Sequence, residues 1–280
     1  MEGFISTNRY HCRVPITEQF AKQLADMPAL EVIQFHDIKP NQQTLDNLND
    51  FVFKYRKDIT LRVYGYNGYW KDISFLKSLC ELERFDWDSD EFLSVEPLYK
   101  LKKLVHLSMG FADTKQKFSV AFLSDFKSAL KSIRLHGDYK DFLSAAPKLD
   151  NIKTVWLSSM KLKSFEFLEG LPIEVLGNYG SRVGSFTFLP KLQTLKRVWI
   201  KTNSTLDNFD FISELPLLEE IELYYVSKLI QFPKCDHLAN LVKVTASDCN
   251  RLSDISEILK LKNCKIAVYG KLVPGKFYRT

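Results

Sequence analysis

The stretch ISFLKSLCELERFDW (73–87) carries the pattern that decides the fold. Its apolar residues stand three apart and then, at its end, two apart: Ile73, Leu76, Leu79, Leu82, Phe85 and Trp87. A step of three is typical of a turn-rich segment, and a step of two is typical of a strand whose alternate side chains face a core. The stretch therefore predicts a compact turn that leads into a short strand.

The same pattern returns along the chain, in VGSFTFLPKLQTLKRVWI (183–200) and in FDFISELPLLEEIEL (209–223). One anchor residue per strand gives a series with spacings of 21 to 26 residues: Leu61, Phe85, Leu107, Ile133, Val155, Leu176, Val198, Ile221, Val244 and Ile266. Ile33, 28 residues before Leu61, extends the series to eleven candidate strands. Such regular spacing indicates a repeat protein in which each unit stacks on its neighbours.

The units resemble the leucine-rich repeats of the internalin-like bacterial type, which have about 22 residues each. The resemblance covers residues from about 30 to 268. It implies an α/β fold, a single right-handed solenoid shaped as a horseshoe or arc over residues 1–280. A parallel sheet would line its concave face, and short helices and 3₁₀ turns its convex face. We expect an N-terminal cap over 1–30, about eleven repeats over 31–268, and a C-terminal cap or tail over 269–280.

The repeats depart from the family pattern at the position of the Asn that ties the turn. Only Asn203 stands there as expected, and other units carry Met160, Ser181, Val226 or Cys249. Phenylalanine also replaces leucine in many convex segments, at Phe75, Phe122, Phe142, Phe167, Phe188 and Phe211. The array is therefore divergent, and irregular loops are expected.

Helices are predicted near the N-terminus and short turns after it. Residues 15–27 place Phe20, Leu24 and Met27 at helical spacing, with Thr17 as the N-cap. A second stripe follows, formed by Leu45, Leu48 and Val52. Later units contain Pro147, Pro172, Pro190 and Pro216, which favour 3₁₀ turns over longer helices. The polar insertion at 111–118 predicts an exposed loop.

Composition excludes several classes of protein. With 45% hydrophobic and 26% charged residues, the chain can bury a core, and it is not typical of disorder. Its net charge of +5 is spread without a dense Lys/Arg run, so nucleic acid is not an expected partner. No signal peptide or membrane span is recognisable, and we expect a cytoplasmic monomer. The cysteines, odd in number, are expected to be reduced and mostly buried: Cys12, Cys80, Cys235, Cys249 and Cys264.

Within each strand, the residues on either side of the buried ones are predicted to point away from the core and to face a partner, because side chains alternate along a strand. The most aromatic and most charged part of this face lies between Arg134 and Tyr224. The candidate partner-binding residues are Arg134, His136, Trp156, Tyr179, Arg197, Trp199, Lys201, Glu222 and Tyr224. Trp, Tyr and Arg are enriched in interaction hot spots, although such rings could instead simply pack on one another. The repeat at Leu176 is one residue short, and a slip in its register by one residue would expose Leu176 in place of Gly177.

No catalytic or metal site is predicted. Asp86, Asp88 and Asp90 begin like a calcium loop, but Glu91 and Pro97 occupy positions that require Gly and Glu. His106 and His136 lie in adjacent units, with no carboxylate recognisable in the sequence to orient either of them. The segment GNYGSRVG (177–184) lacks the Lys-Ser/Thr of a phosphate-binding loop and is interpreted as a turn.

These observations favour a non-catalytic protein-binding scaffold or regulator that uses the concave face of the solenoid. Whether it acts as an adaptor or as an inhibitor is left open. A glycan-binding module that uses the concave aromatic rings is the alternative, and an enzyme is the least favoured class. No cofactor, metal, membrane or nucleic acid is expected.

Overall fold

The computed structural model describes residues 4–6, 8–110, 118–183, 185–269 and 277–279. The chain forms two compact units, residues 1–137 and 138–280, and each is described by itself. The predicted exposed loop at 111–118 lies, apart from Phe118, outside the described residues. In the described part of the chain, no helix is both long enough and apolar enough to cross a membrane.

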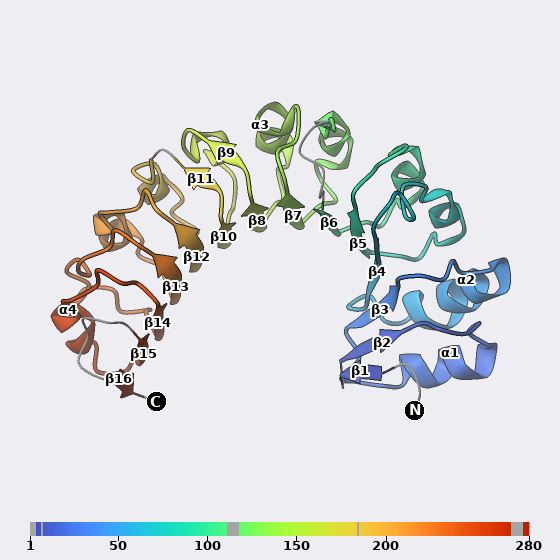
Figure 1. Cartoon of the computed structure of the whole chain (residues 1–280), viewed down its shortest axis with the longest axis horizontal. Coiled ribbons are helices and arrows are strands. Elements are labelled where there is room, and N and C mark those ends of the chain that lie inside the picture. The colour runs from blue at the N-terminus through green and yellow to red at the C-terminus, as the bar shows by residue number, and fades with distance from the viewer. Residues whose placement is uncertain (1–3, 7, 111–117, 184, 270–276, 280) are drawn as a thin grey trace. The chain divides into compact units, whose positions relative to one another are not determined.

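Unit 1 alternates strands with helices and helical turns (Figure 1). Its strands are β1 (Phe4–Ser6), β2 (Arg9–His11), β3 (Val32–Phe35), β4 (Thr60–Gly65), β5 (Arg84–Ser89), β6 (His106–Gly110) and β7 (Ser132–His136). Its helices are α1 (Glu18–Ala25) and α2 (Gln42–Leu48), the latter followed by a π-turn (Asn49–Phe53). Its 3₁₀ turns are Ser74–Ser78, Glu96–Lys100 and Ala121–Phe126.

Unit 2 uses shorter connecting elements, as the prolines predict. Its strands are β8 (Thr154–Ser158), β9 (Lys161–Leu162), β10 (Val175–Tyr179), β11 (Arg182–Val183), β12 (Arg197–Asn203), β13 (Glu220–Val226), β14 (Lys243–Ser247), β15 (Lys265–Tyr269) and β16 (Phe277–Arg279). Its helical turns are α3 (Phe142–Ala145), α4 (Ser256–Leu259) and the 3₁₀ turns Ala146–Lys148, Glu166–Leu168, Leu189–Lys191 and Asp210–Glu214.

Each unit is built on a parallel ladder in chain order. Among the described residues, β2 to β7 pair in parallel in unit 1, and β8, β10, β12, β13, β14 and β15 do so in unit 2. Two antiparallel strands flank the ladders, β1 beside β2 and β16 beside β15. In each unit the helices and turns lie on one side of the strands (Figure 1), and we call the opposite side the open face.

The predicted anchor series is confirmed. Anchors of neighbouring strands pair directly, as Phe85 does with Leu107, and every anchor is buried. The unit at Leu176 keeps the predicted register, because Leu176 is buried and Gly177 pairs with both Trp156 and Trp199. A side chain on the inner side of each strand thus stacks on its counterpart in the neighbouring repeat, which is how a repeat array builds a continuous core.

The first parallel strand was not predicted. Residues 1–30 were expected to be a cap, yet β2 within them pairs in register with β3, and Tyr10 lies opposite Ile33. Tyr10 is 1% exposed, and burial raises its pKa to about 12. A strand of three residues shows no recognisable alternation, but the 23-residue spacing from Tyr10 to Ile33 matches the other units.

Both predicted N-terminal helices are confirmed. The Thr17 hydroxyl accepts from the Phe20 backbone N–H at 3.3 Å and caps α1, and Leu24 is fully buried. The second stripe forms α2 and the π-turn after it, and it buries Leu48 and Val52. The helices thus cover the apolar side of the first strands.

The turn after a strand is held by Asn203 in one repeat and by other contacts in a repeat that lacks this asparagine. Asn203 accepts from the backbone N–H groups of Thr205 and Leu206 at 2.9 and 2.7 Å, so it ties the turn as predicted. One unit away, the Ser181 hydroxyl accepts instead from the Met160 backbone N–H at 3.1 Å. There the chain adds the short parallel pair β9–β11. At Met160 and Ser181, a serine hydroxyl and a short backbone pair therefore take the place of the asparagine.

One core position holds an unexpected polar residue. Asn178 lies between Leu157 and Ile200 on the inner side of the ladder and is 1% exposed. Neither polar atom of its side chain has a hydrogen-bond partner in the described structure. A buried amide without partners costs about 1–3 kcal/mol.

We expect Asn178→Leu to raise the free energy of unfolding by about 1–3 kcal/mol, because it removes that desolvation cost between two aliphatic neighbours. Denaturant unfolding followed by circular dichroism measures the change. Asn203→Leu is the matched control and should have the opposite sign, because Asn203 is a buried amide whose hydrogen bonds are made. A loss of stability in Asn178→Leu would show that the amide has a structural role.

Candidate functional site

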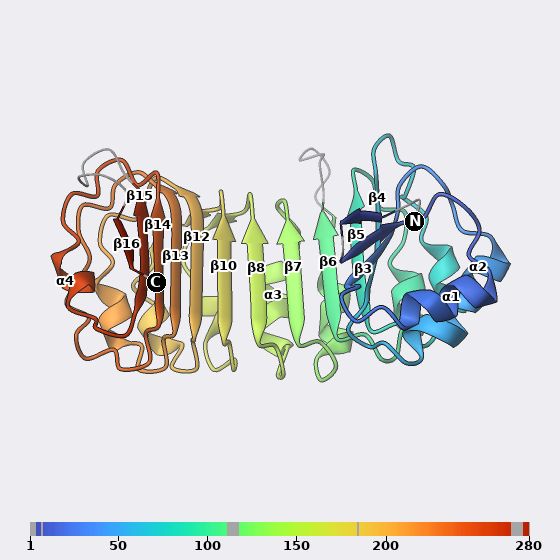
Figure 2. The ribbon, with the colours of Figure 1, turned by 90° about the horizontal axis from the view of Figure 1, so that it is seen from below.

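The candidate site is the open face of unit 2, where β8, β10, β12 and β13 run side by side (Figure 2). In one row across these strands stand Trp156, Gly177, Trp199 and Glu222. In the next row stand Ser158, Tyr179, Lys201 and Tyr224. The parallel register therefore collects the aromatic residues of four successive repeats on one surface.

The four rings of Trp156, Tyr179, Trp199 and Tyr224 form what we call the aromatic cluster. Trp199 is its centre, with ring centroids 5.0 Å from Trp156, 6.3 Å from Tyr179 and 6.0 Å from Tyr224. The interplanar angles of 53° to 74° are those of tilted and edge-to-face pairs. Tyr179 is 41% exposed and the other three rings are partly buried. Mutual packing holds the rings in place while part of their surface stays available.

Gly177 makes the cluster possible. Trp156 and Trp199 belong to strands on either side of β10, and the missing side chain at Gly177 lets their rings meet across it. A Cβ at this position would lie 2.0 Å from Cε3 of Trp156. The tryptophan ring therefore covers the backbone of Gly177, and any other residue would displace it.

The charges around the cluster are partly paired. Arg197 lies 3.3 Å from Glu220, and Lys243 pairs with both Glu220 and Glu222. The Tyr224 hydroxyl donates to Glu222 at 3.1 Å, and burial together with that carboxylate raises the pKa of Tyr224. The two carboxylates of this face are thus neutralised from within the face.

The structure brings together seven of the nine predicted site residues. Trp156 lies on β8, Tyr179 on β10, Arg197, Trp199 and Lys201 on β12, and Glu222 and Tyr224 on β13, all in unit 2. Arg134 and His136 are exposed on β7 of unit 1. Their part in a common site remains a prediction.

Ser108 follows the anchor Leu107, so the alternation predicts that it faces outward, yet it is only 4% exposed. Its neighbours in the row, Asp86 and Arg134, carry longer side chains than its own. A small residue between larger ones is sheltered even on the open side of a sheet.

The open face of unit 1 is polar and contains a histidine relay that the sequence analysis missed. Nε2 of His106 lies 3.0 Å from Oδ1 of Asp86, and Nδ1 lies 2.9 Å from the Ser132 hydroxyl. The expectation that no carboxylate orients His106 was therefore wrong. Asp86 lies one strand away and 20 residues earlier, so only the register of β5 and β6 reveals the contact.

The relay contains the residue types of a hydrolase triad, with Ser132 able to donate to an imidazole that Asp86 orients. Acyl transfer also needs N–H donors for a developing oxyanion. The Ser132 backbone N–H already donates to the Val105 carbonyl at 3.1 Å. This N–H is committed to the ladder and is not available to an oxyanion.

We therefore expect Ser132 to remain unmodified by a fluorophosphonate probe at neutral pH, as judged by intact-protein mass spectrometry. A serine hydrolase of known activity, treated in parallel, controls for the probe. Stoichiometric labelling that disappears in both Ser132→Ala and His106→Ala would contradict this expectation and identify a nucleophile.

The three acidic residues that resemble a calcium loop are used separately. Asp86 contacts His106, Asp88 pairs with Arg62 at 2.7 Å, and Asp90 accepts from two backbone N–H groups of the loop after β4. In the described residues, no group of three or more His, Cys, Asp or Glu side chains is placed to hold a metal ion.

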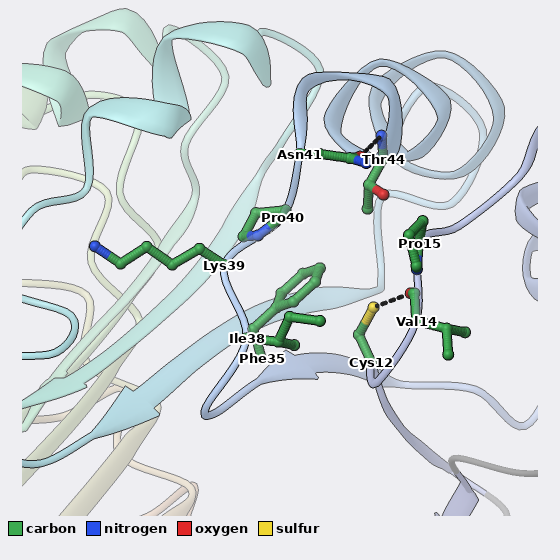
Figure 3. Close-up of a pocket in the computed structure, with 9 residues that line it drawn as sticks. All are labelled: Cys12, Val14, Pro15, Phe35, Ile38, Lys39, Pro40, Asn41 and Thr44. Atoms are coloured by element: carbon green, nitrogen blue, oxygen red, sulfur yellow. Dashed lines mark hydrogen bonds between the residues drawn. The ribbon is translucent and has the colours of Figure 1, made fainter.

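A small pocket of about 230 Å³ lies in unit 1 beside the start of α2 (Figure 3). Its lining is mostly apolar, with Phe35, Ile38 and Pro40 among the residues. The Cys12 thiol donates to the Val14 carbonyl at 3.2 Å, and burial raises its pKa to about 12. Such a thiol stays protonated at neutral pH and is a poor nucleophile. Burial is confirmed for four of the five cysteines, and Cys80 is exposed.

Two features of unit 2 were not recognised in the sequence, the buried Asn178 and the exposed Tyr225. Tyr225 adopts a left-handed conformation, with φ +55°, immediately after a residue of the aromatic cluster. Superposing the units would have placed Tyr225 in the column of Gly180, a residue type that signals this conformation.

Comparison with known proteins supports the fold. No protein-family model matched the chain, and no curated protein matched its sequence. Among solved structures, an internalin from Listeria monocytogenes is 16% identical with a TM-score of 0.61, over 96% of this chain and 74% of the internalin. The Toll–Spätzle complex of Drosophila contains a chain that is 14% identical with a TM-score of 0.53, over 95% of this chain and 43% of that chain. The chain has the leucine-rich-repeat fold, similar to that of the Listeria internalin.

Proposed function

We propose that the chain is a protein-binding scaffold and that its binding surface is the open face of unit 2. The observation that carries the proposal is the aromatic cluster, in which two tryptophans and two tyrosines remain partly exposed on a strand surface. Tryptophan and tyrosine concentrate binding energy in protein interfaces, and rings held by their neighbours lose little entropy on binding.

The fold supports the same proposal by analogy. A repeat array presents a broad surface whose residues vary from unit to unit without disturbing the core. One of the similar structures, the Toll–Spätzle complex, is itself a complex with a partner. The cytoplasmic location and the monomeric state of the chain stay predictions of its sequence.

A glycan is the alternative occupant, because sugars also bind to aromatic rings flanked by polar groups. The tilt of the rings favours protein, since edge-to-face packing gives an uneven surface rather than the flat platform on which a sugar ring stacks. The two classes are separated by experiment.

The test is affinity capture from the source cells with the wild-type chain and with the Trp156→Ala/Trp199→Ala double variant as baits, alongside a glycan array probed with both. We expect a protein that the wild-type bait enriches and the double variant does not. Equal capture by both baits would move the site elsewhere on the chain. Glycan binding that depends on the tryptophans would replace the proposal by the alternative.

A further inference from the structure

Unit 2 repeats a left-handed residue near the ends of five of its strands, β8, β10, β12, β13 and β14. Ser159, Gly180, Thr202, Tyr225 and Asp248 have φ values of +55° to +61°, and they occupy the same position in successive units. The backbone N–H groups of three of them, Ser159, Gly180 and Asp248, donate to carbonyls of the next strand at 2.8 to 2.9 Å, those of Tyr179, Lys201 and Tyr269. The fold therefore imposes this conformation at a position where the ladder continues across the turn.

The residue types in this column differ in how well they tolerate the conformation. Glycine adopts it freely, and Asn and Asp adopt it more readily than other residues, whereas a bulky side chain is strained there. Tyr225 is the bulkiest of the five. Its side chain is 52% exposed and makes no hydrogen bond, ion pair or ring contact within the described structure. No such contact in the described structure offsets the strain.

Strained residues cluster at binding and active sites. Tyr225 follows Tyr224 directly, so it stands at the border of the aromatic cluster. We propose that Tyr225 is a partner-contacting residue that extends the binding surface to the strand ends, and that the partner is a protein presenting carboxylates beside apolar side chains. This inference rests on the proposed function.

The charge on the partner follows from the charges of the surface. Glu220 and Glu222 are both neutralised by Arg197 and Lys243. The Lys201 ammonium lies 5.0 Å from the centroid of the Tyr179 ring and has no carboxylate partner in the described residues. Lys228, three residues after Tyr225, is exposed and likewise unpaired there. Asp248, one repeat beyond Tyr225, is an exposed carboxylate, so these residues together present four cations and three carboxylates. The surface around the rings thus keeps a small excess of positive charge, which acidic groups complement.

The probe is a displayed library of random twelve-residue peptides selected on the immobilised wild-type chain. We expect the enriched peptides to combine Asp or Glu with aromatic or aliphatic residues. A synthetic copy of one enriched peptide should bind with an affinity that falls as salt rises, because surface charge pairs are screened. Lys201→Glu should weaken it further than a neutral Lys201→Gln does.

The role of Tyr225 is tested by Tyr225→Asn, which keeps the backbone conformation at lower strain. We expect its midpoint of thermal unfolding to rise by about 2 °C and its affinity for the selected peptide to fall about tenfold. Thr202→Asn is the matched control, since it relieves the same conformation one unit away, and its affinity should be unchanged. Tyr225→Phe should retain most of the affinity, because it keeps the ring.

Each outcome bears on a separate part of the proposal. Peptide binding that is lost in Trp199→Ala but unchanged in Tyr225→Asn would overturn the role of Tyr225 and leave the proposed function standing. A lower unfolding midpoint in Tyr225→Asn would show that the ring stabilises the fold. Enriched peptides without acidic residues would overturn the charge inference, and no enrichment at all would overturn the proposed function with it.

Discussion

Leu195→Ala should lower the free energy of unfolding by about 2–5 kcal/mol, and Leu218→Ala by a similar amount. Both side chains are fully buried in unit 2 and occupy equivalent positions just before β12 and β13. Truncation removes the transfer free energy of the lost carbons and leaves a cavity that the rigid ladder closes only in part. Because each unit packs on its neighbours, the cavity should weaken the adjoining units as well.

Denaturant unfolding followed by circular dichroism measures this loss, and Leu217→Ala is the matched control. Leu217 adjoins Leu218 but is 41% exposed, so its truncation should change stability by less than about 1 kcal/mol. Hydrogen exchange should show faster opening of β12 and β13 in the buried variants. A loss below about 1 kcal/mol in both Leu195→Ala and Leu218→Ala would mean that these positions are not core.

The core could be predicted from the sequence because burial is periodic. A leucine three residues from the next and a strand anchor every 21 to 26 residues leave little freedom in register. The short unit at Leu176 shows how the register is decided physically. A register shifted by one residue would leave the apolar side chain of Leu176 in water. The observed register buries Leu176 and places the small Gly177 beneath a tryptophan ring.

Side-chain contacts between neighbouring repeats could not be predicted in the same way, because they depend on outward side chains that the repeat pattern does not constrain. The Asp86–His106–Ser132 relay joins three strands at separations of 20 and 26 residues. These three residue types do not recur at equivalent positions of the other repeats. The strain at Tyr225 is a backbone property that no residue type reveals alone. Asn178 occupies a core position of the repeat that is apolar in the neighbouring strands. Only the structure shows that its buried amide lacks hydrogen-bond partners.

The second large effect concerns binding through the aromatic cluster. Trp199→Ala should weaken binding of the captured partner by about 2 kcal/mol or more, which is about thirtyfold, and Trp156→Ala should do the same. Trp199 contacts the three other rings, so its removal takes away its own surface and also frees Tyr179 and Tyr224 to move. The partner would then meet a surface that is both smaller and less ordered.

Calorimetric titration of the captured partner measures these affinities, with circular dichroism to confirm that each variant folds. Thr245→Ala is the control, because Thr245 lies in the same row as Trp199 two strands away and carries a small side chain. Ser108→Ala, a second substitution expected to have little effect on binding, is less suitable because Ser108 is buried. Gly177→Ala tests the geometry without removing a ring, since the added Cβ must displace Trp156 and should weaken binding in the same direction. Unchanged affinity in both tryptophan variants, with the fold intact, would place the binding surface at another edge of the sheet or on the side covered by the helical turns.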